Sequence, residues 1–560
     1  GKRKREQFTA DRKMDELDNL WENDPARFLL YCLEDSRLVI DILDATGLID
    51  LTLKRSELCG TIMSRAWASI HSFDHLYIGA LHKQNFVAPD VGVDRLPISE
   101  SPGGTILPPE SGLFERVILL DFKGLYPSII RTFGIDPLAY IAAQTAAEAG
   151  GSGESDGVGN GAAESGVGGA DGGSGADEAV LRSPNGASFL RGKGILPELL
   201  TRFYHLREDA KRRGDDTASY AFKILANSFY GVLGSPACRF AGSDIATAIT
   251  SFAREILYWS RDFVQELGYR VMYGDTDSLF LIPPGEVKTS DTFRFAAELA
   301  DKLNSSLSTW VREKYRVESY LEIEFENIFA PFFIPPLKSV ASQEIQERLR
   351  QAHLSGPQGR AKSYAGLSFT ESGFRDKKHE LVMKGMEAVR SDWTHLARKI
   401  QKDILYKIFT GSEKTEIAEY LGGIIRQIRE PEGRHLLIIR KRLSKTASQY
   451  RGSLPPHVRA ALIAEKQRSG KKPLRRIQYI MTADGPMPYF EDTVGADGAG
   501  ADGGGADGGG ADIAEADIGW YITKQVIPVL KSINAAVPYD LTAVVRRFFH
   551  PDGQLDLGVE

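Results

Sequence analysis

Two stretches of the sequence can contribute nothing to a hydrophobic core, and they limit where the rest of the chain can fold. Residues 145–179 are rich in Gly, Ala and acidic side chains, and no Lys or Arg occurs between Arg131 and Arg182. Residues 495–512 repeat Gly-Ala-Asp every five residues. Segments so poor in large apolar residues cannot offset the entropy lost on ordering. We expect both to be flexible acidic insertions. The alternative is a calcium-binding β-helix repeat, which is also rich in Gly and Asp, but such repeats have a nine-residue period with a large apolar position that these stretches lack.

The remaining sequence has the composition of several globular domains. A chain of 560 residues is too long for one core and suggests roughly three to five domains. Hydrophobic residues make up 42% and charged residues 26%, as in soluble proteins. The sequence contains no apolar run long enough for a membrane span and no hydrophobic signal core at its N-terminus. Three widely spaced cysteines argue against a zinc site or a disulfide framework and fit a reducing cytoplasm.

Charge is distributed unevenly along the chain. The formal net charge of −6 by itself argues against a nucleic-acid partner. Residues 431–480, however, contain thirteen Lys and Arg and only two Glu. The acidic insertions therefore mask a strongly basic C-terminal region, and the mean charge is a poor guide to partners.

Outside the insertions, apolar patterns predict a mixed α and β chain. Residues 116–122 and 269–275 are apolar, β-branched runs bounded by polar residues or Gly, and we expect strands there. Residues 196–214 and 217–234 have helical spacing and a short polar turn between them, which predicts a helical hairpin. From about residue 380 the chain is predicted to be mainly helical and basic.

Two aspartates, Asp275 and Asp277, stand one residue apart at the end of the second predicted strand. Carboxylates crowded this closely repel each other and resist burial, so a bound divalent cation or a solvated turn is needed. Asp-x-Asp also occurs in metal-dependent glycosyltransferases and in ordinary turns. The motif alone leaves these alternatives open.

Three separated stretches together resemble a known family. They are DFKGLYPSII (121–130), KILANSFYG (223–231) and YGDTDS (273–278). These look like motifs A, B and C of the family B DNA polymerases, and their order and spacing make a chance match negligible. A glycosyltransferase would explain the third stretch but neither the second nor the basic C-terminal half.

The resemblance implies a two-metal phosphoryl transfer. That chemistry needs charge neutralisation and in-line positioning more than covalent help, and hard cations such as Mg²⁺ prefer oxygen ligands. Asp121 and Asp277 are the expected carboxylate ligands of two Mg²⁺ ions, with Mn²⁺ as a substitute, and the Phe122 carbonyl is a third oxygen. Asp275 is the less direct catalytic member of its pair. For an isolated Asp, a helix cap or a turn would be the alternative.

The resemblance also implies a dNTP site. It consists of Leu125, Tyr126, Arg207, Lys211, Lys223, Asn227 and Tyr230. The three cations would hold the triphosphate, and Tyr126 has the place of the ring that leaves no room for a 2′-OH. A solvated helix face with Glu208 and Arg212 as ion-pair partners is the alternative. Gly124 stands where the family usually has Ser, which would loosen the turn at the triphosphate.

Primer-template DNA is expected to bind the later part of the chain. KSYAG (362–366) resembles the family's Lys-x-Tyr motif near the primer terminus. The implied DNA-binding residues are Lys362, Tyr364, Lys384, Arg390, Arg440, Lys441 and Arg442. Phosphate contacts position a duplex without reading its sequence, and a charged solvated surface is the alternative for each residue.

Two further stretches resemble incomplete family elements. Tyr31 and Asp35 resemble the third 3′–5′ exonuclease motif, but the carboxylates of the two earlier motifs are missing, so we expect a C-terminal portion without proofreading of its own. An N-terminal exonuclease-containing chain is a possible partner. The C-terminal residues Gln554, Leu555 and Leu557 resemble a sliding-clamp peptide in which Gly558 replaces the aromatic anchor, so clamp binding would be weak.

The resulting prediction is an α+β multidomain right-hand polymerase. Its parts are an exonuclease remnant (1–55), a palm with an antiparallel sheet and helices (56–195 and 243–375), helical-hairpin fingers (196–242) and a mainly helical thumb (376–560). The implied function is template-dependent DNA synthesis in replication or repair, in a prokaryotic cytoplasm at the nucleoid and without membrane attachment. The alternative is a non-catalytic DNA-binding or assembly subunit derived from a split polymerase.

Overall fold

The structure is a computed structural model that describes residues 13–91, 103–151, 179–285, 289–337, 358–369, 379–467, 474–490 and 512–548. The chain divides into two compact units. Unit 1 comprises residues 1–37, 108–117 and 328–560, and unit 2 comprises residues 38–107 and 118–327. Two separate clusters of buried apolar side chains form the cores, as expected for a chain too long for one core.

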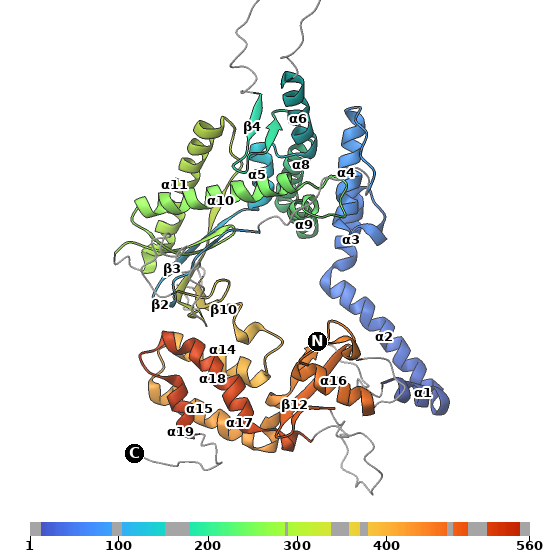
Figure 1. The fold of residues 1–560 in the computed structure, drawn as a ribbon, viewed down its shortest axis with the longest axis vertical. Helices are drawn as coiled ribbons and strands as arrows, with labels where there is room; N and C mark the ends of the chain where they lie inside the picture. Colours follow the sequence, from blue (N-terminus) through green and yellow to red (C-terminus); the bar gives the residue numbers. More distant parts are fainter. Residues whose placement is uncertain are drawn as a thin grey trace, which may run out of the picture. The chain divides into compact units, whose positions relative to one another are not determined.

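An antiparallel sheet lies at the centre of unit 2. Its strands run in the order β1 (Ile106–Leu107), β6 (Arg270–Asp275), β7 (Ser278–Ile282) and β3 (Val117–Phe122). The strands predicted at 116–122 and 269–275 are confirmed. Helix α10 (Ser243–Glu266) packs against β6, and α11 (Thr289–Tyr315) packs against α10 (Figure 1). The apolar run of β3 is buried almost throughout.

The predicted helical hairpin is also confirmed. Helix α8 (Leu196–Arg212) packs along α9 (Asp216–Leu233) (Figure 1). Asp215 begins α9 by accepting a hydrogen bond from the Ala218 N–H (2.9 Å), which satisfies one of the free donors of the first turn. The ring of Phe203 on α8 lies 5.7 Å from Phe222 and 5.9 Å from Phe229 on α9, centroid to centroid.

Helix α6 (Pro137–Gly151) corrects one predicted boundary. The first insertion is expected to begin near residue 145, but the helix continues to residue 151. Its sequence there is rich in Ala, which has the highest helix propensity. Residues 152–178 and 491–511 lie outside the described residues, so the flexibility of the two insertions stays a prediction.

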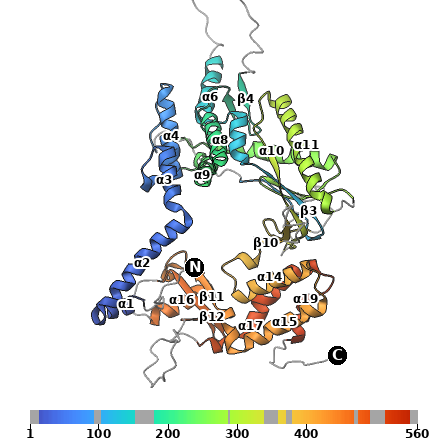
Figure 2. The same ribbon diagram turned by 180° about the vertical axis from the view of Figure 1, so that it is seen from behind.

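Unit 1 combines strands and helices. Strand β8 (Ile323–Ile334), which begins in unit 2, pairs with β2 (Gly112–Phe114) and β9 (Tyr364–Phe369), and β9 pairs with β10 (Glu380–Lys384). Helices α14 (His395–Phe409), α15 (Lys414–Arg429), α18 (Ile527–Ile533) and α19 (Leu541–Phe548) form a group (Figure 1, and from behind in Figure 2). The region after residue 380 is less purely helical than predicted, because α16 (Pro456–Gln467) packs on a three-stranded sheet of β11 (Ile439–Arg442), β12 (Arg476–Thr482) and β13 (Gly485–Pro488).

The remaining large elements are N-terminal helices. They are α1 (Lys13–Asn23), α2 (Pro25–Thr46), α3 (Leu48–Cys59) and α4 (Ser69–Lys83), followed later by α5 (Leu125–Phe133). In the described part of the chain, no helix combines the length and apolar character that a bilayer span requires. The fold is α+β with antiparallel sheets, as predicted.

Candidate active site

The end of β3 meets the β6–β7 turn and brings two predicted metal ligands close together. Asp121, next to last in β3, is directly opposite Ser278, the first residue of β7. The Phe122 N–H donates to the carbonyl of Asp277 (2.9 Å). The carboxylates of Asp121 and Asp277, far apart in the sequence, are therefore on neighbouring backbone segments, and both residues are half-buried.

Asp275 lies one strand farther away. It is opposite Ser278 across the β6–β7 hairpin, so Ser278 stands between Asp275 and Asp121 in the sheet. Directly opposed side chains share a face, and two strand spacings put the Asp275 and Asp121 backbones about 10 Å apart. The Asp275 carboxylate accepts from the hydroxyls of Tyr273 and Thr276 (3.2 Å each). This placement distinguishes Asp275 from Asp277, although the role of each stays a prediction.

The turn between the two aspartates has an unusual backbone. Thr276 has φ +61°, in the left-handed region that β-branched residues avoid. Its N–H donates to the Thr105 carbonyl (2.9 Å). The neighbouring Gly104 leaves the necessary room, because a Cβ there would lie 2.3 Å from the Thr276 hydroxyl oxygen. Surrounding contacts hold this costly conformation, a pattern that is concentrated at functional sites.

Helix α5 begins immediately after β3, at a turn that requires glycine. Gly124 precedes the helix with φ +54°, a conformation that costs other L-residues roughly 1 kcal/mol or more. A Cβ at Gly124 would lie 3.6 Å from the Asn227 side-chain oxygen, so Asn227 on α9 faces this turn. Leu125, the first residue of α5, is buried. The left-handed backbone gives a physical reason for Gly at the position where the family usually has Ser.

Tyr126 and Tyr230 form an aromatic pair beside the aspartates. Their ring centroids are 4.1 Å apart at 33°. Burial raises the pKa of Tyr126 to about 12, and the charges of Tyr230, Asp277 and Asp275 act in the same direction. The Tyr126 hydroxyl is therefore within electrostatic reach of both turn carboxylates and stays protonated at neutral pH. The structure brings Tyr126, Tyr230 and the two carboxylates together.

Three predicted triphosphate-binding cations lie on the helical hairpin. Arg207 has a buried Nε with no hydrogen-bond partner among the described residues. Lys211 pairs with Glu208 (2.8 Å), and its hydrogen bond, with the charges of Arg207 and Lys123, lowers the pKa of Glu208. Lys223 is exposed, and no carboxylate pairs with it in the part of the chain that the structure describes. Arg207 and Lys223 are thus available to an anion, whereas Lys211 is engaged by Glu208.

Sequence reasoning missed Lys123, which lies next to the candidate metal site. Its Nζ is 2.7 Å from Glu322 and 3.1 Å from Glu324, and its N–H donates to the Glu322 carbonyl (2.8 Å). The available signals were a cation directly after Asp121-Phe122 and the alternating acids of Glu322-Ile-Glu324, which place both carboxylates on one face of an extended segment.

The residues at the strand ends suit a hard divalent cation. Asp121 and Asp277 supply carboxylate oxygens and Phe122 a carbonyl oxygen, the donors that Mg²⁺ and Mn²⁺ accept. Within the described ranges, no three or more His, Cys, Asp or Glu side chains form a group able to hold a metal ion. The candidate ligand set therefore combines two carboxylates with backbone oxygen.

In unit 1 the structure brings three of the predicted DNA-binding residues together. Lys384 on β10 is directly opposite Tyr364 on β9, and its Nζ lies 5.6 Å from the Tyr364 ring centroid. Lys362 has φ +58°. Its carbonyl packs so closely on Gly385 that a Cβ there would lie 1.8 Å away. Tyr364 is only 4% exposed, so its ring is part of the protein interior. Lys384 is exposed and is the accessible charge of this pair.

The other predicted DNA contacts are distributed over two elements of unit 1. Arg390 donates twice to the Asp392 carboxylate (3.0 and 2.8 Å), which raises the pKa of Arg390. On β11, Arg440 and Arg442 are exposed and Lys441 is half-buried, as the alternation of a strand requires. Arg440 also donates to the Gln478 side chain (3.1 Å). To contact DNA, Arg390 would have to replace its hydrogen bonds to Asp392 with hydrogen bonds to a phosphate.

The remaining predicted residues lie at the two ends of the chain. Tyr31 and Asp35 lie four residues apart on α2, on one face of the helix, and Tyr31 is buried. The predicted clamp-binding residues Gln554, Leu555 and Leu557 lie outside the described residues. The role of each set stays a prediction.

Comparisons with known proteins agree with this geometry. The sequence model of DNA polymerase family B matches residues 68–339 and 360–526. DNA polymerase II of Escherichia coli K12 is 33% identical over 485 residues, which cover 85% of this chain and 54% of that protein. The DNA polymerase of Archaeoglobus fulgidus is 28% identical over 65% of this chain and 38% of its own length. The chain therefore spans about half the length, or less, of these relatives.

A solved structure supports the fold. The family B DNA polymerase of the archaeon Pyrobaculum calidifontis superposes with a TM-score of 0.55 at 22% identity, over 93% of this chain and 58% of that one. The family match covers most of the chain and includes the β3 end, the helical hairpin and the β6–β7 turn. On this basis, the chain belongs to DNA polymerase family B.

Proposed function

We propose that this chain is a DNA-directed DNA polymerase that adds dNTPs to a primer 3′-hydroxyl. The observation that carries the proposal is the hydrogen bond from the Phe122 N–H to the Asp277 carbonyl, which joins the start of motif A to the turn of motif C. The family match and the similarity to DNA polymerase II support it. The chain covers 54% of that relative's length, so activity, substrates and partners are proposed here for this chain alone.

The proposed mechanism assigns a task to each group at the site. Divalent ions, Mg²⁺ or Mn²⁺, held by Asp121, Asp277 and the Phe122 carbonyl would neutralise charge at the transferred phosphoryl group. Arg207 and Lys223 bind the triphosphate, Arg207 through the planar fork of its guanidinium group. Tyr126, packed on Tyr230, forms the wall beneath the sugar. Lys211 joins them when phosphate replaces Glu208.

The domain assignment follows the same proposal. Unit 2 contains the palm sheet and the α8–α9 fingers. The strands β9 and β10 and the region from β11 to α19 supply palm and thumb surfaces for primer-template DNA. The proposed phosphate contacts are Lys362, Lys384 and the β11 residues Arg440 and Arg442. Such contacts would make DNA binding salt-dependent.

Primer extension tests the proposal. Wild type should extend a labelled primer with dNTPs and Mg²⁺, while Asp277→Ala and Asp121→Ala should lose most of the activity. Asp301→Ala, an exposed acid on α11, is the matched control and should extend normally. If wild type binds primer-template DNA but does not extend it, the chain is the non-catalytic subunit instead.

We also propose that this chain does not proofread by itself. Tyr31 and Asp35 resemble only one exonuclease motif, and a two-metal hydrolytic site needs more carboxylates than Asp35 supplies. A separate exonuclease-containing chain is the proposed source. Rapid degradation of a labelled mismatched primer by this chain alone would contradict the proposal.

A further inference from the structure

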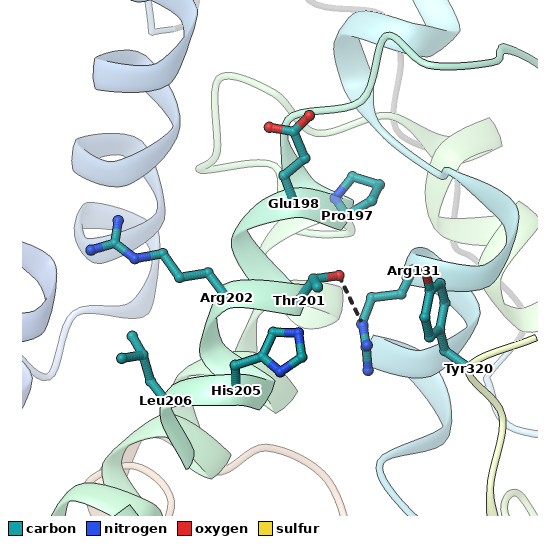
Figure 3. Close-up of a pocket in the computed structure, with 8 residues that line it drawn as sticks. All are labelled: Arg131, Pro197, Glu198, Thr201, Arg202, His205, Leu206 and Tyr320. Carbon is teal, nitrogen blue, oxygen red and sulfur yellow. Dashed lines mark hydrogen bonds between the residues drawn. The ribbon is translucent and has the colours of Figure 1, made fainter. Parts of the chain in front are cut away.

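A hollow of about 590 Å³ opens beside α8. It is lined by Arg131, Pro197, Glu198, Thr201, Arg202, His205, Leu206 and Tyr320 (Figure 3). All of these residues belong to unit 2. The volume lies within the range of small-ligand sites. None of the predicted nucleotide-binding residues lines it, so it is distinct from the candidate active site.

Arg131 is the fixed cation of this hollow. Its guanidinium carbon lies 4.7 Å from the ring centroid of Tyr204 and 4.3 Å from that of Tyr320. Its Nε–H donates to the Thr201 hydroxyl (3.1 Å), as Figure 3 shows. The Tyr320 N–H in turn donates to the Thr132 hydroxyl (2.9 Å). Two rings and one hydrogen bond therefore hold the guanidinium plane in place before any ligand arrives.

The other edge of the guanidinium is available. An arginine has five N–H donors, and only the Nε–H of Arg131 is used within the described part of the chain. No carboxylate pairs with Arg131 among those residues. Glu198 lies at the rim and points away from the guanidinium (Figure 3). A planar fork of four N–H groups with no acid partner is suited to bidentate recognition of phosphate.

The neighbouring groups favour an anion over a nucleobase. The imidazole of His205 faces Arg131 from α8, and Arg202 adds a second cation on the other flank of the helix (Figure 3). Single-stranded nucleic acid would need aromatic faces for stacking. Arg131 already covers one face of each of the two tyrosines, so phosphate binding is the better use of this surface.

The hollow lies on the helix that also carries Arg207, but on a different face. Arg207 follows His205 by two residues on α8, and residues two apart do not share a face of a helix. We propose that the hollow binds a polyphosphate group through the N–H edge of Arg131: the triphosphate of an arriving nucleotide or the pyrophosphate released after transfer. The identity of these ligands rests on the proposed function, whereas their binding can be measured without catalysis.

Calorimetric titration with inorganic tripolyphosphate, without divalent ions and at low salt, tests the proposal. A Lys223→Ala background weakens the active-site contribution. In that background Arg131→Lys keeps the charge but loses the planar fork, and affinity should fall about tenfold. His205→Gln should weaken binding severalfold. Arg212→Gln is the matched control, because it removes an exposed cation of α8 outside the hollow, and it should change affinity less than twofold.

Thermal unfolding of each variant checks that its fold is intact, and His205→Gln replaces Arg131→Lys if the latter is unstable. Separate titrations with dATP and with pyrophosphate show which of the two is the ligand, because the affinity for that ligand should fall in the same variants. Equal tripolyphosphate affinity of both hollow variants and the parent overturns the proposal. The proposal is also overturned if the hollow variants bind only an oligo(dT) strand more weakly than the parent does. Failure of primer extension would affect none of these measurements.

Discussion

Asp136 is buried between α5 and α6 and holds the start of α8 through backbone hydrogen bonds. Its Oδ2 accepts from the N–H groups of Ile195 (2.9 Å) and Leu196 (2.7 Å). Its Oδ1 accepts from the Tyr77 hydroxyl (2.7 Å), the Leu138 N–H (2.7 Å) and the Ala139 N–H (3.2 Å). Helix α8 has no side-chain cap of its own, so Asp136 caps α6 and α8 at once.

Replacing Asp136 with Asn should release the first turn of α8. The amide has one oxygen, which can serve the three donors around Oδ1. Its NH₂ group then faces the N–H groups of Ile195 and Leu196, two buried donors left without an acceptor. Each unsatisfied donor costs about 1–3 kcal/mol of stability. Removal of the buried charge offsets part of this cost, so we expect a net loss of about 3 kcal/mol in the stability of the first turn of α8.

Hydrogen exchange read by mass spectrometry locates this effect. A loss of about 3 kcal/mol corresponds to roughly a hundredfold faster exchange in a peptide that covers residues 190–206. Tyr77→Phe, which removes one donor, should cost only about 1 kcal/mol. Asp244→Asn is the control, because Asp244 is exposed and its carboxylate accepts a hydrogen bond from the Tyr140 hydroxyl (2.7 Å). Unchanged exchange at the start of α8 in Asp136→Asn would refute the capping role.

Three further perturbations test other parts of the chain. Glu387, 2% exposed, accepts from Arg360 (2.9 and 3.3 Å) and Gln401 (2.8 Å). Glu387→Gln leaves Arg360 without its counter-charge, and a urea titration should show a loss of about 3 kcal/mol. Asp540 accepts from Thr542 and Asn534, which lowers the pKa of Asp540. Its stabilisation is therefore present above the ordinary carboxyl pKa and lost as the pH falls through the depressed value. Thermal unfolding of Asp540→Ala should show a deficit of about 1 kcal/mol at pH 7 that shrinks below about pH 4, whereas a constant deficit would contradict the sign. Tyr126→Ala should raise ribonucleotide relative to deoxyribonucleotide incorporation in single-turnover extension, while Tyr220→Ala, an exposed tyrosine of α9, should not.

The predicted strands and the helical hairpin depend on local patterns, which explains why they are confirmed. An apolar run such as β3 and the spacing of α8 and α9 are determined by neighbouring residues. The predicted start of the first insertion near residue 145 is too early, because low-complexity composition is typical of disorder, whereas the Ala residues of α6 favour a helix. The strands β11 to β13 were missed because the basic residues of this region hide a short alternating pattern.

The candidate site also combines features that local sequence determines with features that depend on long-range contacts. Motif residues such as Asp121 and Asp277 could be named from the sequence, but their proximity depends on the register of β3 with β7, which is a long-range property. Lys123 was missed because its partners Glu322 and Glu324 are far along the chain. Arg131 was missed because its environment is formed by residues from α8 and from the segment before β8. Periodicity carries no information on such contacts.

Asp136 connects the two ends of the proposed nucleotide site. Helix α5 starts at the motif A turn with Leu125 and ends at Phe133, and Asp136 follows within three residues. Its carboxylate then fixes the first turn of α8, the helix that carries Arg207. The position of α8 relative to the motif A turn therefore depends in part on one buried carboxylate, which touches neither that turn nor the proposed triphosphate-binding residues. Loosening α8 should weaken dNTP binding while leaving the β3–β7 register unchanged. In steady-state extension, Asp136→Asn should raise the KM for dNTP far more than it weakens primer-template binding. An equal loss of both would mean that the substitution unfolds unit 2 as a whole.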